Sequence, residues 1–432
     1  MSGKVRAVGL DFGTTNSAIA IVGEDGAPRL AQFPSEDGAL IETFRSILFF
    51  EAVEETGSGE AVLSAGNDAI RRYLTASGQG RLIQSLKSFL ADSGFETTEI
   101  MGEQYSLGDL IAPILAELRR AAEAQFGELP ERVVAGRPVH FSGGDAAGAN
   151  ELARRRLDIA IRRAGWSEVV FEYEPIGAAY DYARRIARAE LALIADFGGG
   201  TSDFSLLRLA PGADSRRHEI LGNDGVAIAG DAFDGSITRH LAAPALGRGS
   251  MYRTPYGEVL PVSTWPYTKL ERWHLLSLLR ARETMHKLRR LCDDALEPEK
   301  IAALVHIVEN DLGYYLFRSV EAAKLALSDR ETATFHFADP PNVEIESPIA
   351  RREFEDWIAR YLREIAECVD GLLANAGVGP AKIDSVFLTG GSSFVPAVRR
   401  IFADRFGADR LRMGNEFTSV ARGLALRALD GA

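Results

Sequence analysis

The chain has 432 residues, of which 46% are hydrophobic and 25% charged, and its formal net charge is -12. These fractions are ordinary for a globular protein and exclude wholesale disorder, while the length predicts two or three domains. The negative charge opposes general nucleic-acid binding, which needs a positive surface. The sequence contains no run of about 20 apolar residues, the length that could span a bilayer. Residues 1–6 lack the apolar core of a signal peptide. We therefore expect neither a nucleic-acid nor a membrane partner.

The cysteine content indicates the cellular compartment in which the chain is expected. Cys292 and Cys368 are the two cysteines of the chain, too few for a disulfide framework in a protein of this length. The expected location is therefore the reducing cytoplasm.

Four apolar segments, residues 5–11, 132–139, 191–196 and 384–389, are predicted to be buried strands. Helices are predicted over residues 109–126, 150–164 and 348–376, where apolar residues recur at steps of three and four. For the last helix, Ser347 is the expected cap and Pro348 fits the first turn. Arg154, Arg155 and Arg156 are expected to form a solvated face. Strands that alternate with helices predict layered α/β architecture.

A faint internal duplication predicts two related lobes. The motif LDFGTT at residues 10–15 is echoed by ADFGGGT at residues 195–201, and the two aspartates are 196 − 11 = 185 residues apart. We expect lobe I at residues 1–187, with an insertion at about 36–108, and lobe II at residues 188–432, with an insertion at about 225–320. The second insertion includes a stretch rich in proline and aromatic residues (244–266) and a basic run predicted to be helical (269–290).

The first repeat is predicted to be a strand, a tight turn and a second strand, unlike the strand–turn–helix of dinucleotide and P-loop sites. Gly13 lets the backbone approach a ligand closely, and successive N–H groups of such a turn bind anions. Thr14, Thr15 and Asn16 add donors. Asp11, at the strand end, can hold hydrated magnesium through its carboxylate.

The second repeat, residues 196–203, is also predicted to be a glycine turn between two strands. In it, Gly198, Gly199 and Gly200 precede Thr201. Either turn alone fits an ordinary hairpin equally well, but both together, one lobe apart, favour binding of a nucleotide polyphosphate. A third turn at residues 387–393 precedes a predicted helix, whose N-terminus could offer N–H groups to a ribose or phosphate. This turn also fits a plain connection.

The three motifs together resemble the DnaK-type heat-shock chaperone family, within the actin and sugar-kinase superfamily, over residues 8–426 and most closely its short, YegD-like branch. The resemblance implies a two-lobed actin-like ATPase fold of ribonuclease H-like repeats, each lobe a mixed sheet flanked by helices. It implies ATP or ADP and Mg2+ as cofactors, with K+ as a further candidate ion, and a client or co-chaperone that the sequence does not identify. Because the chain ends soon after the ATPase region, no C-terminal peptide-binding domain is expected.

The resemblance also implies roles for individual residues. The implied catalytic residues are Lys87, Glu174, Asp196, Thr201 and Asp11, and the implied metal ligands are Asp11 and Asp196. The implied nucleotide-binding residues are Gly13, Thr14, Thr15, Asn16, Gly198, Gly199, Gly200, Gly230, Glu321, Lys324, Ser328, Gly390, Gly391, Ser392 and Ser393. Leu325 and Phe394 replace two arginines that flank the adenine in the family, and Phe417, beside Glu416, stands where the family has an aspartate.

The expected function is slow, magnesium-dependent ATP hydrolysis by a chaperone-like protein, with lobe closure coupled to the nucleotide state. Two alternatives stay open: a small-molecule kinase of the sugar-kinase type, and a nucleotide sensor or scaffold that does not hydrolyse ATP. Individual residues have alternatives too. Lys87 also fits a surface lysine, Glu174 a helix cap, and Glu321 with Lys324 a solvated helical pair.

Overall fold

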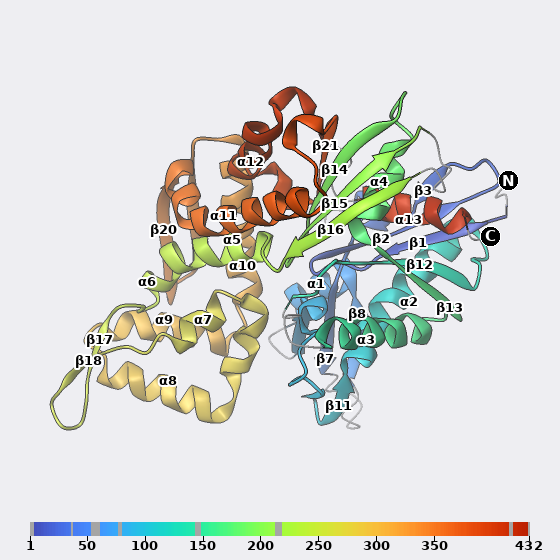
Figure 1. Ribbon diagram of the computed structural model, residues 1–432. Helices are drawn as coiled ribbons and strands as arrows, with labels where there is room; N and C mark the ends of the chain where they lie inside the picture. The colour runs from blue at the N-terminus through green and yellow to red at the C-terminus, as the bar shows by residue number, and fades with distance from the viewer. Residues whose placement is uncertain are drawn as a thin grey trace. The chain divides into compact units, whose positions relative to one another are not determined.

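The computed structural model describes residues 4–35, 38–52, 61–76, 80–142, 148–211, 218–413 and 418–430, and the backbone alone at residues 273, 274, 277 and 278. The chain forms two compact units (Figure 1). Unit 1 comprises residues 1–230 and 363–432, and unit 2 comprises residues 231–362. Unit 1 therefore contains both copies of the duplicated motif. The predicted division into lobes at residues 187 and 188 stays a prediction.

The first sheet of unit 1 is mixed and carries the first glycine turn. Its strands lie in the order β13-β12-β1-β2-β3. β1 pairs in parallel with β12 and antiparallel with β2, so a hairpin is joined to parallel strands. The strands are β1 (Ala7–Asp11), β2 (Asn16–Val22), β3 (Pro28–Leu30), β12 (Arg132–Arg137) and β13 (Glu168–Tyr173).

The second sheet of unit 1 repeats this pattern around the second glycine turn. Its order is β16-β15-β14-β21-β22, with β14 antiparallel to β15 and parallel to β21. The strands are β14 (Glu190–Phe197), β15 (Ser202–Leu209), β16 (Glu219–Val226), β21 (Ser385–Thr389) and β22 (Leu411–Met413). The four predicted buried strands and both predicted strand–turn–strand motifs are confirmed, and the shared topology supports the predicted duplication.

Two helices, α4 (Glu174–Ala183) and α13 (Ser419–Leu429), share one apolar core with both sheets. Ala20 and Val134 of the first sheet and Ile194 and Phe387 of the second are fully or almost fully buried in it. The helices approach very closely, because a β-carbon on Gly423 would stand 1.6 Å from the carbonyl oxygen of Gly177. The core thus connects the strands that end at the two glycine turns (Figure 1).

The outer faces of the two sheets are also covered by helices. On the first sheet, α2 (Leu107–Phe126) and α3 (Ala149–Arg163) contribute to a second core that includes Val8 and Ile21. On the second, the rings of Phe197 and Phe204 lie 5.8 and 6.3 Å from the ring of Phe402 on α12 (Pro396–Phe406). Helices therefore pack on each mixed sheet, as predicted.

A smaller part of unit 1 lies in sequence between β3 and β12 of the first sheet. It contains the sheet β8-β7-β9, formed by β7 (Ile47–Ala52), β8 (Ala61–Ala65) and β9 (Gly80–Gln84), with α1 (Gly66–Thr75) beside it. β9 leads directly into a short 3₁₀ turn, Leu86–Phe89, which carries Lys87. The remaining short strands are β4 (Phe33–Pro34), β5 (Leu40–Ile41), β6 (Phe44–Arg45), β10 (Thr97–Ile100) and β11 (Glu103–Ser106).

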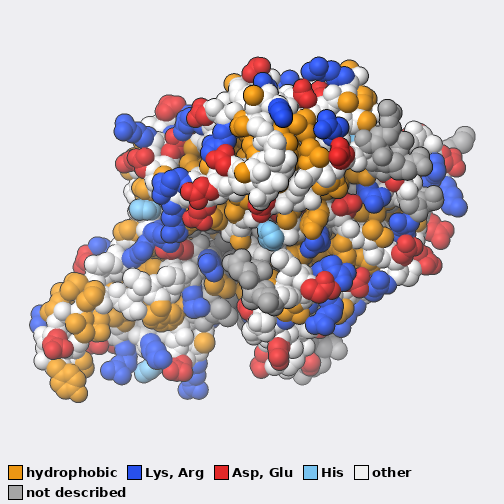
Figure 2. All heavy atoms as spheres, viewed as in Figure 1, with side chains coloured by type: hydrophobic (Ala, Val, Ile, Leu, Met, Phe, Trp, Pro, Cys, Tyr) orange, Lys and Arg blue, Asp and Glu red, His pale blue; other side chains and the backbone are white. Residues whose placement is uncertain are grey.

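Unit 2 is mainly helical and has two hairpins. Its helices are α5 (Gly230–Ile237), α6 (Ala243–Ala245), α7 (Trp265–Leu270), α8 (Arg282–Asp294), α9 (Pro298–Glu309), α10 (Gly313–Asp329) and the first turns of α11 (Arg351–Asn375). Its hairpins are β17 (Met251–Arg253) with β18 (Val259–Pro261) and β19 (Thr332–Asp339) with β20 (Val343–Ala350). Hydrophobic side chains gather on the β17–β18 end of the unit (Figure 2), where Tyr256 is 93% exposed.

Two helix predictions need correction. The helix expected from residue 348 begins at Arg351, because Ser347 and Pro348 pair with Phe335 and Thr334 in the β19–β20 hairpin. Ser347 is therefore no cap. The basic run 269–290 is not one helix: it is divided among α7, a 3₁₀ segment (Trp273–Arg280) and α8. Among the described residues, no helix combines the length and the apolar character needed to cross a membrane.

Candidate functional site

The two glycine turns lie against each other within unit 1. A β-carbon on Gly200, in the second turn, would stand 3.5 Å from Thr14 Oγ1 in the first and 2.9 Å from Ser142 Oγ. The second turn is closed by a hydrogen bond from Gly198 N–H to the Thr201 carbonyl, at 3.0 Å. A side chain at position 200 would lie in the space between the turns, against the hydroxyl groups of Thr14 and Ser142.

The first turn is tied to the segment that follows it in unit 1. Gly13 N–H donates to Ser17 Oγ at 3.2 Å, and Ser46 N–H donates to the Thr15 carbonyl at 2.9 Å. Asn16 Oδ1 accepts from the Arg45 guanidinium at 3.4 Å, so a cation stands beside this turn. The backbone of the predicted anion-binding loop is therefore held in place by neighbouring residues.

A buried ion pair lies beside the turns. Lys87 Nζ is 2.6 Å from Glu174 Oε1, and both residues are less than a tenth exposed. The interpretation of Lys87 as a surface lysine is therefore wrong. Glu174 is the first residue of α4, followed by Pro175, so its carboxylate stands at the positive end of a helix.

Three aspartates complete a cluster of charges with this ion pair. Asp11 ends β1, Asp196 lies near the end of β14, and Asp203 is the direct cross-strand partner of Asp196 on β15. Asp203 Oδ1 accepts a hydrogen bond from Val139 N–H at 2.6 Å. Because the two hairpins end at their glycine turns, the same strands that form the turns also carry the carboxylates.

Burial and mutual repulsion make these carboxylates hard to ionise. Burial, followed by the charge of Glu174, raises the pKa of Asp11 to about 7 against the attraction of Lys87. The same two causes raise the pKa of Asp203 to about 7 and, with Asp11 also contributing, the pKa of Asp196 well above its usual value. The pKa of the Lys87 ammonium is raised, since Glu174 and Asp11 outweigh its burial. The site therefore has an excess of buried negative charge.

This excess fits a divalent cation. Oxygen ligands from carboxylates suit Mg2+, which keeps most of its water and needs few direct protein ligands. No three side chains of His, Cys, Asp or Glu in the described part of the chain gather as a direct metal-binding group. The assignment of Asp11 and Asp196 as ligands of a hydrated Mg2+ stays a prediction.

The comparison with protein families decides the relationship of the chain. The family model described as Hsp70 protein matches residues 87–248 and 306–429, which is more than half of the chain. The chain belongs to the Hsp70 family. The predicted actin-like α/β ATPase fold, with mixed sheets flanked by helices, is confirmed at the same time. Placement in the YegD-like branch stays a prediction.

Individual Hsp70 relatives are distant. Two proteins named chaperone protein DnaK, from two strains of Thermus thermophilus, are each 25% identical to this chain over 438 residues. The alignment covers 98% of this chain and 60% of each relative, so the chain spans about 60% of their length. The first glycine turn lies outside the family-model match, as do residues 249–305 in unit 2.

The third predicted turn packs on the second. Gly390 has φ of 82°, and a β-carbon there would stand 2.1 Å from the Phe197 carbonyl oxygen, so only glycine fits. Gly391 begins a 3₁₀ turn, and Ser392 and Ser393 are buried. The Arg399 guanidinium lies 5.5 Å from the centre of the Phe394 ring. Helix α12 then begins at Pro396, so the predicted strand–turn–helix order is confirmed with a 3₁₀ turn inserted.

Of the remaining predicted residues, Gly230 joins the second turn and three lie in unit 2. Gly230 N–H donates to the Gly198 carbonyl at 3.4 Å. Glu321, Lys324 and Ser328 lie along α10, where Ser328 Oγ donates to the Lys324 carbonyl at 3.3 Å. Lys324 Nζ donates to Asp234 Oδ2 at 2.8 Å, so the interpretation of this lysine as part of a solvated pair is wrong.

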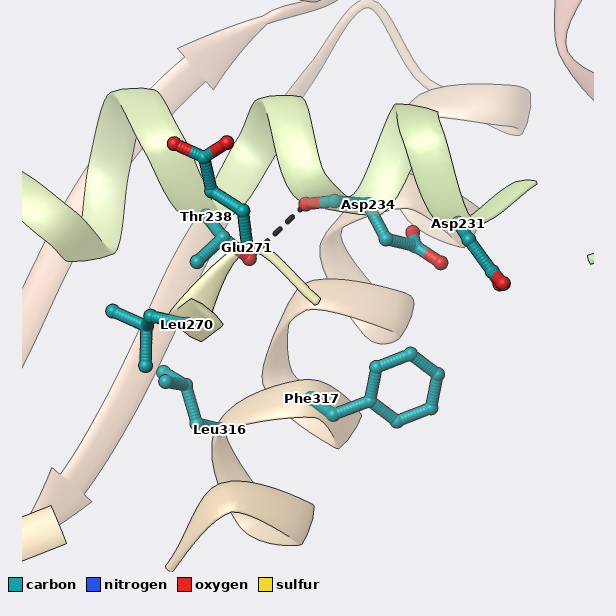
Figure 3. Close-up of a pocket in the computed structure, with 7 residues that line it drawn as sticks. All are labelled: Asp231, Asp234, Thr238, Leu270, Glu271, Leu316 and Phe317. Carbon is teal, nitrogen blue, oxygen red and sulfur yellow. Dashed lines mark hydrogen bonds between the residues drawn. The ribbon is translucent and has the colours of Figure 1, made fainter. Parts of the chain in front are cut away.

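A small cavity of about 20 Å³ lies beside this ion pair in unit 2 (Figure 3). Thr238 Oγ1 donates to the Asp234 carbonyl at 3.1 Å along one wall, and Leu316 and Phe317 form an apolar wall. Burial, then the charge of Asp234, raises the pKa of Asp231 to about 6. This volume is enough for about one water molecule.

Leu325 is 62% exposed on α10. Glu416 and Phe417 lie outside the described residues.

Asp203 belongs to the cluster although no role was predicted for it. The sequence could have indicated it, because Asp203 lies in the first strand after the second glycine turn, directly opposite Asp196. Arg45 was also missed. No local pattern marks it, since it reaches Asn16 from a strand 29 residues away.

Proposed function

We propose that this Hsp70-family chain binds ATP between its two glycine turns and slowly transfers the γ-phosphoryl group to water. The observation that carries the proposal is the buried Lys87–Glu174 ion pair beside Asp11, Asp196 and Asp203. Phosphoryl transfer depends mainly on positioning and on neutralising charge. One buried ammonium group among excess carboxylates, next to two anion-binding turns, suits that task.

Asp11 and Asp196 would hold hydrated Mg2+, which when bound neutralises charge on the phosphates. Lys87 would donate to the γ-phosphate, and Glu174 would accept a hydrogen bond from the attacking water and orient it. The Lys87–Glu174 contact fixes both side chains before a ligand arrives, which reduces the reorganisation needed in the reaction. Thr201 and the glycine-turn N–H groups would contact the phosphates.

The adenosine would be bound by the turn at residues 390–393. In the turn, the burial of Ser392 and Ser393 favours contacts through the backbone. Arg399 over Phe394 could supply the cationic character that the replaced arginine would have given. Closure of the predicted lobes on ATP, and nucleotide-dependent binding of a client protein, would form the chaperone-like output.

Turnover of ATP by the purified chain, with and without EDTA, tests the proposal. We expect slow phosphate release that needs Mg2+, and a loss of about 10²-fold or more in kcat for Lys87→Met and Glu174→Gln, because each removes a group that acts in the transition state. Ile159→Ser, at a 41% exposed position on α3, is the matched control and should behave as wild type.

Two outcomes would replace this function. Faster phosphate transfer to a sugar than to water would favour a small-molecule kinase. ATP binding with equally inert wild type and variants would favour a nucleotide sensor or scaffold.

A further inference from the structure

Arg156 does not lie on a solvated face of α3, which corrects the prediction for this residue. Its guanidinium donates to four backbone carbonyl oxygens in one segment, those of Phe89, Leu90, Asp92 and Phe95, at distances between 2.5 and 3.3 Å. The segment begins in the 3₁₀ turn that carries Lys87. One side chain of α3 therefore gathers the carbonyl groups that follow Lys87 in the chain.

This segment needs an external support. Ser85, just before the 3₁₀ turn, has φ of 55°, a left-handed conformation that disfavours a residue with a β-carbon. The turn itself has few internal bonds: Ser88 N–H donates to the Ser85 carbonyl at 3.0 Å and Leu90 N–H to the Lys87 carbonyl at 3.2 Å. A turn this short has little intrinsic stability.

The connection from Arg156 to Lys87 is short and consists of hydrogen bonds. Arg156 holds the Leu90 carbonyl at 3.0 Å, and Leu90 N–H in turn holds the Lys87 carbonyl. Carbonyl oxygens that converge at the end of a helical turn are a negative site, and a cation there is favourable. The planar guanidinium has five N–H donors and can serve several carbonyls at once, which an ammonium cannot do with the same geometry.

We propose that Arg156 is a positioning residue, which fixes the backbone of residues 86–95 and thereby holds Lys87 in contact with Glu174. The proposal rests on the proposed function for the role of Lys87 in turnover, but the positioning itself does not. Phe89 and Phe95 also support the segment, with ring centres 5.4 Å apart, so its loss of order in an Arg156 variant should be local.

The neighbouring arginine provides a matched control. Arg155 lies on the same helix, is exposed, and makes none of these bonds to the segment. Arg156→Met keeps much of the side-chain volume and removes the donors, Arg156→Lys restores one charge and part of the hydrogen bonding, and Arg155→Met removes an equal charge from the surface.

The experiment combines amide hydrogen exchange of the free protein with steady-state ATP turnover. For Arg156→Met we expect exchange at residues 86–95 to rise about tenfold or more while α2 and the second sheet are unchanged. We also expect kcat to fall between about tenfold and 10²-fold, as misplacement of a catalytic group does, with KM for ATP within about twofold of wild type. Arg156→Lys should be intermediate in both readouts, and Arg155→Met should match wild type.

Unchanged exchange at residues 86–95 in Arg156→Met overturns the proposal, whatever the turnover. A uniform rise of exchange across unit 1, or equal effects of Arg155→Met, also overturns it, because the role would then be general stability. If the wild type binds ATP but does not turn it over, the proposed function fails separately, and the local exchange of the three variants still decides the role of Arg156.

Discussion

Lys87 Nζ and Glu174 Oε1 lie 2.6 Å apart although the two residues are 87 positions apart in the chain. Glu174 raises the pKa of Asp11, Asp196 and Asp203, while Lys87 lowers it. The two members of the pair therefore act in opposite directions on the remaining carboxylates. Removing Lys87 and removing Glu174 should therefore change the stability of the protein by different amounts.

Lys87→Met should destabilise the metal-free protein at pH 7 by on the order of 3 kcal/mol, because it leaves Glu174 buried without its partner. Glu174→Gln should cost clearly less, since the amide also removes one of the charges that repel the aspartates. Chemical unfolding of both variants and of the double variant measures the difference. A larger cost for Glu174→Gln than for Lys87→Met would show that repulsion among the carboxylates is unimportant.

Binding of Mg–ATP should strengthen as pH rises from about 6 to about 8. Asp11 has a pKa of about 7 in the ligand-free protein, so it is mainly protonated at the lower pH and mainly ionised at the higher one. A cation needs the ionised form, and binding near neutral pH should therefore release protons. Calorimetry in two buffers of different ionisation enthalpy measures that release. Because the pKa values of Asp196 and Asp203 are also raised, Asp11→Asn should reduce the pH dependence without abolishing it. An unchanged pH profile in this variant would contradict the assignment.

The space around two helical glycines predicts opposite effects when each is replaced by alanine. Gly423→Ala should destabilise the protein by about 1–3 kcal/mol or more, because its β-carbon would overlap the Gly177 carbonyl and force α4 and α13 apart. Gly371→Ala, on α11 with no atom within 4 Å of the new β-carbon, should stabilise by up to about 1 kcal/mol through helix propensity. Thermal unfolding of the two variants side by side tests the prediction, and equal shifts would refute it.

The stability of unit 2 should depend on pH through Asp231. Its pKa in the folded protein, about 6, exceeds the ordinary value of 3.8, so the folded state binds the proton more tightly than the unfolded state. The wild type should therefore lose stability as pH rises from about 4 to about 6.

Asp231→Asn avoids that loss, so its melting temperature should exceed that of the wild type above about pH 6.5 and equal it near pH 4. Scanning calorimetry at the two pH values measures this. A gain at pH 4 of the same size would point to packing instead of charge.

Local patterns in the sequence predicted much of the fold. The two strand–turn–strand motifs were recognisable because a buried strand, a terminal aspartate and a glycine turn are neighbours in the chain. The start of α11 was misplaced because Ser347 and Pro348 fit a helix start locally, while their pairing with β19 decides otherwise. Arg156 was misjudged for the same reason, since its acceptors lie more than 60 residues earlier.

The sequence by itself determined the α/β class and the two glycine turns with the strands that flank them, since these depend on periodicity and on residues that follow one another. The tertiary structure alone decided that Lys87 is buried against Glu174, that Asp203 joins the cluster and that Arg156 supports the lysine. The charge state of a carboxylate depends on how much water its neighbours exclude and which charges they bring near, and both are set by residues distant in the chain.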